Sequence, residues 1–213
     1  MIKRIIILTK SSKHHAYCVA AIDIESKKLI RLVSNDINSY YALTDSNLRY
    51  ADNSRVEILD CVDVVCIKDN PTPLQPENLL IDTKYKFEKI KKYSINDCVI
   101  ICPTSKSKMI LGNNSHLVST TAIHSVGKSI EFIEFSNGII SGIDKGNGYY
   151  KFKLSFFSNG VRYQSFSITD PDFYQSHNGQ QINSGYAIIS LPDDEWSKNN
   201  GYYKFVAKIF FKN

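Results

Sequence analysis

Short apolar runs, each ended by polar or turn-forming residues, restrict this chain to a fold built mainly from β-strands. The first three runs are rich in β-branched residues and occupy residues 5–8, 17–22 and 29–33. Runs of four to six such residues have the length of strands, and no apolar run approaches the ~20 residues of a membrane-spanning helix. The pattern predicts three strands within the first 34 residues and a mostly β protein with little helix.

Alternation of polar and apolar residues is clearest between residues 149 and 168. One parity holds Tyr150, Phe152, Leu154 and Phe156, and the other holds Tyr149, Lys151, Lys153 and Phe157. The Asn-Gly pair at 159–160 predicts a hairpin, and its returning strand carries Arg162, Gln164 and Phe166 on one parity. We expect one face of this hairpin to be core and the opposite face to be aromatic and basic.

Prolines and turn signals divide the rest of the chain. Three of the six prolines lie at positions 71, 73 and 76, where they exclude a helix or a central strand and predict an extended connector. Further strands are expected at residues 56–67, 97–102, 130–135, 185–191 and 202–211, with a turn at 136–138 after the third of these. Residues 104–108 have the composition of a linker. About five strands fall on each side of it, which is the count of two OB-like five-stranded barrels at residues 1–105 and 106–213.

The charge of the chain is mildly basic and unevenly distributed. The net charge is +5, and residues 1–110 contain 17 Lys and Arg against 13 Asp and Glu, whereas residues 111–213 contain 9 against 8. Such a balance permits a polyanionic partner. It favours the N-terminal half as the part of the chain that contacts this partner. Five cysteines without a secretory signal or membrane span indicate a cytoplasmic protein with reduced thiols and no membrane partner.

Two polar segments of the N-terminal half are candidate binding surfaces. The loop at residues 9–15 places Lys10, Ser11, Lys13 and His14 between two apolar strands, and Arg31 is the one cation inside an otherwise apolar strand. We expect Lys10, Lys13 and Arg31 to converge on one anion. The long loop at residues 35–53 carries three tyrosines suited to base stacking, Tyr40, Tyr41 and Tyr50. The alternative for this loop is a tyrosine-lined flap over the end of a barrel.

The motifs of catalysis and metal binding are missing from the sequence. His14, His15 and Cys18 have side chains that bind zinc, but a fourth ligand is lacking and a buried, apolar Cys18 is the alternative. No P-loop, G-x-S-x-G or H-E-x-x-H occurs. Asp170 before Pro171 fits a turn cap, the alternative being a catalytic carboxylate pair with Asp172. The sequence therefore favours a binding module over an enzyme, with no cofactor and no metal.

Several segments also resemble the bacterial dual OB-containing domain family. The likeness lies in residues 6–13, 17–23, 29–34, 167–171, 187–191 and 203–209. The chain departs from the family pattern at Ala21 and at Pro192, where the family usually has glycine. The resemblance implies two OB barrels and a nucleic-acid partner, and it supplies no catalytic residues.

Strand count, basic loops and exposed aromatic residues together predict binding of single-stranded DNA or RNA. The phosphate-binding and stacking set is Lys10, Ser11, Lys13, His14, Arg31, Tyr40, Tyr41 and Tyr50. Two alternatives remain open. The same surfaces could bind a protein partner, or the chain could be a receptor or enzyme for a small nucleotide.

Overall fold

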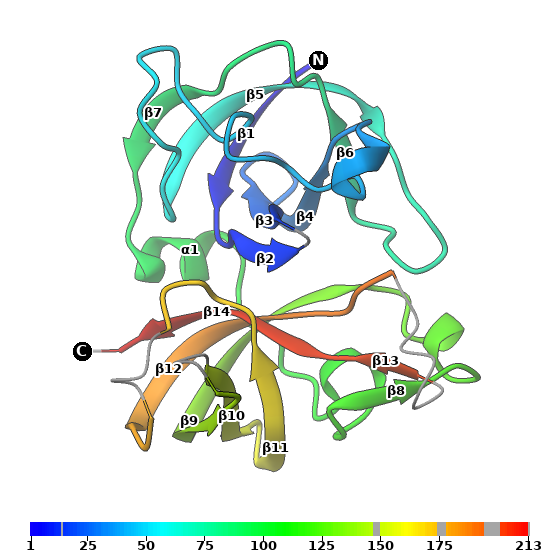
Figure 1. The fold of residues 1–213 in the computed structure, drawn as a ribbon, viewed down its shortest axis with the longest axis vertical. Coiled ribbons are helices and arrows are strands. Elements are labelled where there is room, and N and C mark those ends of the chain that lie inside the picture. Colours follow the sequence, from blue (N-terminus) through cyan, green and yellow to red (C-terminus); the bar gives the residue numbers. More distant parts are fainter. Residues whose placement is uncertain (14, 147–149, 174–177, 194–200, 213) are drawn as a thin grey trace. The chain divides into compact units, whose positions relative to one another are not determined.

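The computed structural model divides the chain into two compact units (Figure 1). Unit 1 comprises Met1–Thr72 and Pro76–Pro103, and unit 2 comprises Pro73–Gln75 and Thr104–Asn213. The structure describes residues 1–13, 15–146, 150–173, 178–193 and 201–212, apart from the side chain of Lys13. Each unit is built on a ring of β-strands, which confirms the mostly β fold predicted from the sequence.

Unit 1 contains a ring of five strands in the order β1-β3-β4-β6-β5, closed by pairing of β5 with β1. The strands are β1 (Ile2–Ile7), β3 (Ala16–Asp23), β4 (Lys28–Val33), β5 (Asp60–Asp69) and β6 (Asn78–Ile81). β4 and β6 run parallel, and the other neighbours in the ring run antiparallel. The three strands predicted within the first 34 residues are therefore present as β1, β3 and β4.

Shorter elements surround this ring. The additional strands are β2 (Ser11–Lys13), which pairs with β3, and β7 (Glu88–Lys92), which pairs with β5. The segment between β4 and β5 contains one 3-10 turn, η1 (Ile37–Ser39), and inserts Leu43, Leu48 and Val56 into the core. The leucines of the long loop at residues 35–53 thus anchor it to the core of the barrel.

One element of unit 1 was predicted wrongly from the sequence. Residues 97–102 lie largely in a helix, α1 (Ile95–Ile101), instead of the expected strand. Ser94 and Asp97 form a capping box, in which each side chain accepts a hydrogen bond from the backbone N–H of the other residue. This local stabilisation of the first turn outweighs the β-propensity of Val99, Ile100 and Ile101.

Unit 2 is a closed barrel with the same strand order as the ring of unit 1. Its strands are β9 (Ile130–Asp144), β10 (Tyr150–Ser158), β11 (Val161–Ile168), β12 (Gln181–Ser190) and β14 (Phe205–Phe211). β11 and β14 run parallel, as β4 and β6 do in unit 1. Strands one, two and three of this barrel are therefore β9, β10 and β11. The predicted strand at 202–211 is divided at Lys204 into β13 (Gly201–Tyr203) and β14.

The turn predicted at residues 136–138 is absent, because β9 runs through this position. Asn137 has a positive φ of 50°, as a turn residue would, but the chain continues in the same strand. Gly138 lies against the ring of Phe135, where an added Cβ would come within 2.7 Å of a ring carbon. The Asn-Gly pair therefore accommodates a local distortion of a long strand instead of reversing the chain.

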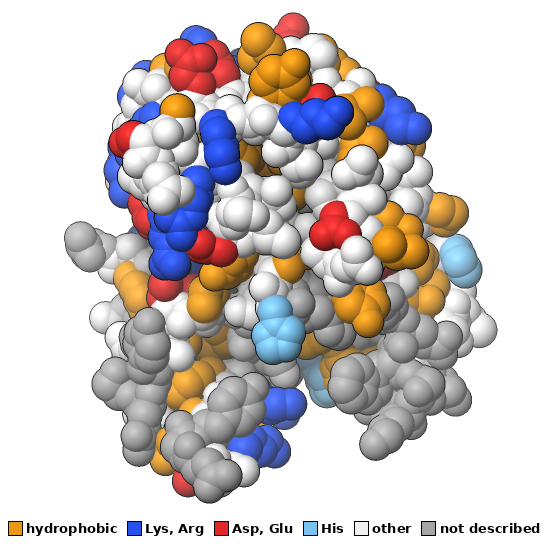
Figure 2. All heavy atoms as spheres, turned by 45° about the horizontal axis from the view of Figure 1, so that its top comes forward, with side chains coloured by type: hydrophobic (Ala, Val, Ile, Leu, Met, Phe, Trp, Pro, Cys, Tyr) orange, Lys and Arg blue, Asp and Glu red, His pale blue; other side chains and the backbone are white. Residues whose placement is uncertain are grey.

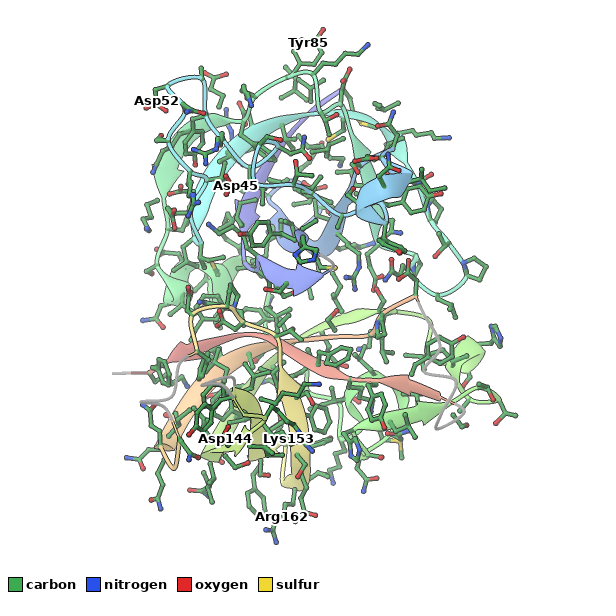
Figure 3. The ribbon with its side chains drawn as sticks, viewed as in Figure 1. Asp45, Asp52, Tyr85, Asp144, Lys153 and Arg162 are labelled. Carbon is green, nitrogen blue, oxygen red and sulfur yellow. The ribbon has the colours of Figure 1, made fainter. Side chains whose placement is uncertain are left out.

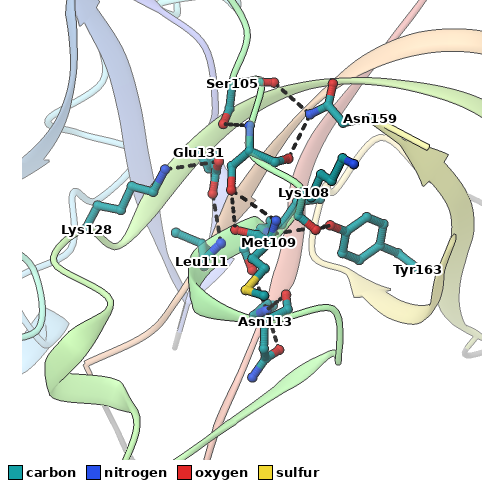
Figure 4. Close-up of polar contacts among 12 residues, drawn as sticks. Ser105, Lys108, Met109, Leu111, Asn113, Lys128, Glu131, Asn159 and Tyr163 are labelled. Carbon is teal, nitrogen blue, oxygen red and sulfur yellow. Dashed lines mark hydrogen bonds and ion pairs between the residues drawn. The ribbon is translucent and has the colours of Figure 1, made fainter. Parts of the chain in front are cut away.

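The segment before β9 is attached to the barrel of unit 2. It contains η2 (Ile110–Gly112), β8 (Leu117–Ser119) and η3 (Ile123–Ser125), and it inserts Ile110, Leu111, Val118 and Ile123 into the barrel core. The amide of Asn159 donates to the carbonyls of Ser105 and Ser107 at 3.0 and 2.8 Å, and the hydroxyl of Tyr163 donates to Lys108 at 2.7 Å (Figure 4). Residues 104–108, interpreted from composition as a linker, are thus held by hydrogen bonds within unit 2.

Candidate functional site

Lys10 is the one lysine of the loop at residues 9–15 whose side chain the structure describes, and it contacts other parts of unit 1. The Nζ atom of Lys10 donates to the carbonyl of Val56 at 2.6 Å and lies 3.6 Å from the carboxylate of Glu57. Ser11 is buried, and Arg31 is only 4% exposed within β4. The side chain of Lys13 and the whole of His14 lie outside the described residues. Lys10 and Arg31 therefore present little free charge at the surface, and the predicted anion site stays a prediction.

The three predicted stacking tyrosines have different environments. Tyr40 and Tyr41 are 54% and 49% exposed and follow one another in the left-handed region of the backbone after η1. Tyr50 instead belongs to the core of unit 1, and its hydroxyl donates to the buried carboxylate of Asp60 at 2.6 Å. Burial and this carboxylate raise the pKa of Tyr50. Tyr40 and Tyr41 can meet a ligand, whereas Tyr50 has a structural role in the folded chain.

Ion pairs neutralise many cations elsewhere in unit 1. Lys3 pairs with Asp23 at 2.7 Å, Arg4 pairs with Asp63 at 2.8 Å, and Lys89 pairs with Asp60 at 3.0 Å. Arg49 and Arg55 share the carboxylate of Asp45. Figure 2 shows a face of the molecule on which Lys and Arg side chains lie beside Asp and Glu side chains. These pairs therefore offset part of the positive charge in the N-terminal half.

A surface that combines basic and apolar side chains lies on the barrel of unit 2, and we call it the β9–β11 outer face. It consists of the outward side chains Ile139, Ile143, Lys151, Lys153, Phe157, Arg162 and Gln164. Phe152, Leu154 and Phe156 point the opposite way into the barrel core, as the alternation predicted. Lys151 pairs across the sheet with Ile143, and Phe157 pairs with Arg162. Apolar and cationic side chains are therefore direct neighbours on this face. Tyr149, predicted for the same face, lies outside the described residues.

Phe166 is not on the outer face, although its parity placed it with Arg162 and Gln164. The pairing of β10 with β11 shifts register between Leu154 and Phe156, and Ser165 has a φ of 60°. This bulge reverses the parity of the strand, so Phe166 turns inward and packs on Phe156 and Tyr163. The outer face consequently carries fewer aromatic rings than the sequence predicted.

The cations of the outer face have no acidic partners among the residues that the structure describes. Lys151, Lys153 and Arg162 form no ion pair with any of them. Figure 3 shows Lys153 and Arg162 on the barrel of unit 2, with Arg162 directed away from it. Asp144, at the end of β9, accepts a hydrogen bond from the backbone of Gly146 at 2.7 Å. Unpaired cations beside apolar side chains form a surface suited to a polyanion that also carries flat apolar groups.

Asp170 and Asp172 form a structural cluster. Asp170 accepts a hydrogen bond from the backbone N–H of Asp172 at 3.1 Å, and its carboxylate pairs with Lys208 at 3.1 Å. Lys208 also contacts the carboxylate of Asp172. Burial raises the pKa of Asp170, while Lys208 opposes this shift. The arrangement matches a turn cap with an ion pair, the first of the two interpretations of this motif.

The cysteines lie in no metal-binding group among the residues that the structure describes. None of the five forms a disulfide bond, and burial raises the pKa of Cys98 to about 12. The residues that the structure describes contain no group of three or more His, Cys, Asp or Glu that could hold a metal ion. A buried thiol with a raised pKa is a poor nucleophile.

Comparison with known families agrees with the topology of the two units. The family model described as "Dual OB-containing domain" matches residues 3–209. The chain belongs to this family. In this dual OB-containing domain, each unit has a ring of five strands joined in the same order, with the third and fifth strands of the ring parallel. No curated protein and no solved structure matches the chain.

None of the helices in the described parts of the chain is long and apolar enough to cross a membrane.

Proposed function

We propose that this dual OB-containing domain binds single-stranded nucleic acid through the β9–β11 outer face. OB-folds bind oligonucleotides on the face of their second and third strands, and these strands are β10 and β11 in unit 2. The observation that carries the proposal is the position on this face of Lys151, Lys153 and Arg162, which form no ion pair with any described residue.

The outer face combines the two interactions that a single strand requires. Lys151, Lys153 and Arg162 neutralise phosphates, with release of counterions. Phe157, which is 38% exposed, and the exposed Ile139 and Ile143 offer apolar contact to bases. Stacking of one base on an aromatic ring contributes about 1–3 kcal/mol. Since every base has a flat apolar face, this contact alone tolerates many sequences.

The alternative interface is the set predicted in unit 1, of which Tyr40 and Tyr41 are the most exposed members. The partial burial of Lys10 and the burial of Arg31 make unit 1 the weaker candidate. If the β9–β11 outer face is the interface, substitutions in unit 2 weaken binding and substitutions in unit 1 do not. If the set in unit 1 is the interface, the reverse holds.

Fluorescence anisotropy with labelled single-stranded DNA and RNA at low salt tests the proposal. The variant Lys151→Ala/Lys153→Ala/Arg162→Ala should bind at least roughly tenfold more weakly than wild type. The control Lys10→Ala/Lys13→Ala removes two cations from unit 1 and should bind like wild type. Thermal unfolding of both variants verifies that each is folded. Unchanged binding by the triple variant, or no binding of any single strand by wild type, rejects the proposal.

A further inference from the structure

A groove lies at one side of the β9–β11 outer face, entirely within unit 2. It has a volume of about 460 Å³ and is lined by Asn114, Ser115, His116, Arg162 and Gln164. Small-molecule sites start at about 300 Å³, so the groove can accept one nucleotide. Arg162 and Gln164 belong to both the groove and the outer face, and a strand bound to that face would pass its opening.

A pair of rings forms part of this region. The imidazole of His116 stacks on the ring of Tyr203, with centroids 5.7 Å apart and planes inclined by 19°. Both rings are half-buried. Burial lowers the pKa of His116, and the charges of Lys153 and Lys204 act in the same direction. The imidazole is therefore largely uncharged at neutral pH and can stack as a flat ring on a base.

The pair of rings is held in place by the backbone around it. Tyr203 belongs to β13, which pairs with β8 in the register Tyr203 to Leu117. Gly201 allows this close pairing, because a Cβ there would come within 2.5 Å of the carbonyl oxygen of Val118. The backbone N–H of Lys204 donates to the carbonyl of His116 at 2.8 Å. The rings are thus positioned before any ligand arrives, which reduces the entropic cost of binding.

The polar groups that line the groove can hydrogen-bond to a base and to a phosphate. Arg162 can pair with a phosphate, since its guanidinium presents two parallel N–H donors. Asn114 and Gln164 each offer an amide donor and an amide acceptor, the combination that pairs with the N6 and N7 edge of adenine. The described residues of the lining include no carboxylate, which is the acceptor suited to the amino group of cytosine.

We propose that this groove holds one adenine nucleotide of a bound strand, with the base against His116 and between the amides of Asn114 and Gln164, and a phosphate on Arg162. The inference rests on the proposed binding of single-stranded nucleic acid. It adds a preference for adenine to an interface that otherwise tolerates all bases. An adenine also covers more of the His116 ring than a pyrimidine does.

The test compares binding of deoxyadenosine and thymidine homopolymers of about a dozen nucleotides, a length within the range of OB-fold sites. Wild type should bind the adenine strand roughly tenfold more tightly, which corresponds to about 1.4 kcal/mol. Gln164→Ala and His116→Ala should each lower this ratio several-fold while the thymine strand still binds. Asn96→Ala, which removes an exposed amide from α1 in unit 1, should leave the ratio unchanged.

The outcomes separate the two proposals. Binding of both strands without a preference for adenine, or a preference that survives both Gln164→Ala and His116→Ala, overturns the adenine site and leaves the outer face as the interface. Absence of binding to either strand overturns both proposals. Comparing ratios between variants cancels the stacking within the free adenine strand, because that contribution is the same for every protein.

Discussion

Lys204 shows how much one side chain contributes to the arrangement of unit 2. It is 1% exposed, and its Nζ atom donates to the carbonyls of Ile110 and Asn113 and to the side-chain oxygen of Asn113. These bonds join the start of β14 to the segment that leads into the groove. Burial lowers the pKa of Lys204 to about 7, against an opposing contribution from Glu131. Local sequence patterns do not reveal this role, because a lysine between strand residues is ordinarily solvent-exposed.

The lowered pKa of Lys204 predicts a pH-dependent stability. The ordinary pKa of lysine, about 10.4, applies to the unfolded chain, so between pH 7 and 10 the unfolded state binds more protons than the folded state. The contribution of Lys204 to the free energy of unfolding should therefore rise with pH across this window, by up to roughly 1 kcal/mol per pH unit, and be constant below it.

Urea unfolding of wild type and Lys204→Met at pH 6, 8 and 9 measures this effect. The difference between the two free energies of unfolding should grow in favour of wild type from pH 6 to pH 9. Lys204→Met should also be less stable at every pH, because it leaves three buried acceptors without their donor. A difference that is the same at all three pH values would show that Lys204 stays charged in the folded protein.

Among the elements, the strands with a clear local pattern were predicted well and the distorted ones were not. β3 and β4 follow from short apolar runs and β10 follows from alternation, since these patterns are local. The inward turn of Phe166 depends on the bulge at Ser165, and the passage of β9 through Asn137 depends on packing against Phe135. These features are decided by contacts with other strands, which local patterns do not encode.

The helix α1 is an exception, because its signal was present in the sequence. Ser94 and Asp97 have the spacing of a capping box, with Asp in place of the usual Glu or Gln. Ser94→Ala should cost α1 about 1 kcal/mol. Amide hydrogen exchange at Cys98 and Cys102, whose N–H groups close the turns of α1, should then become roughly fivefold faster.

Ser94→Thr is the matched control for this prediction, because threonine keeps the capping hydroxyl. Its exchange rates in α1 should stay close to those of wild type. Equal exchange rates in Ser94→Ala and wild type would mean that packing of Cys98, and not the cap, holds the helix.

For the whole molecule, net charge and the proposed interface point to different halves of the chain. The N-terminal half carries the larger excess of cations, yet Lys3, Arg4 and Lys89 are paired with carboxylates. Pairing depends on the approach of strands that are distant in sequence, so composition cannot reveal it. The aromatic and basic face of the 150–168 hairpin was visible in the sequence, whereas the groove beside it depends on the placement of residues 114–116.

The salt dependence of binding tests most directly the claim that Lys151, Lys153 and Arg162 contact phosphates. The logarithm of the association constant falls with the logarithm of salt concentration by about 0.7 per phosphate neutralised on a single strand. We therefore predict that wild type has a slope steeper by about 2 than Lys151→Ala/Lys153→Ala/Arg162→Ala, and that Lys10→Ala/Lys13→Ala keeps the slope of wild type. Equal slopes for wild type and the triple variant, or a slope lost only in Lys10→Ala/Lys13→Ala, would contradict the account.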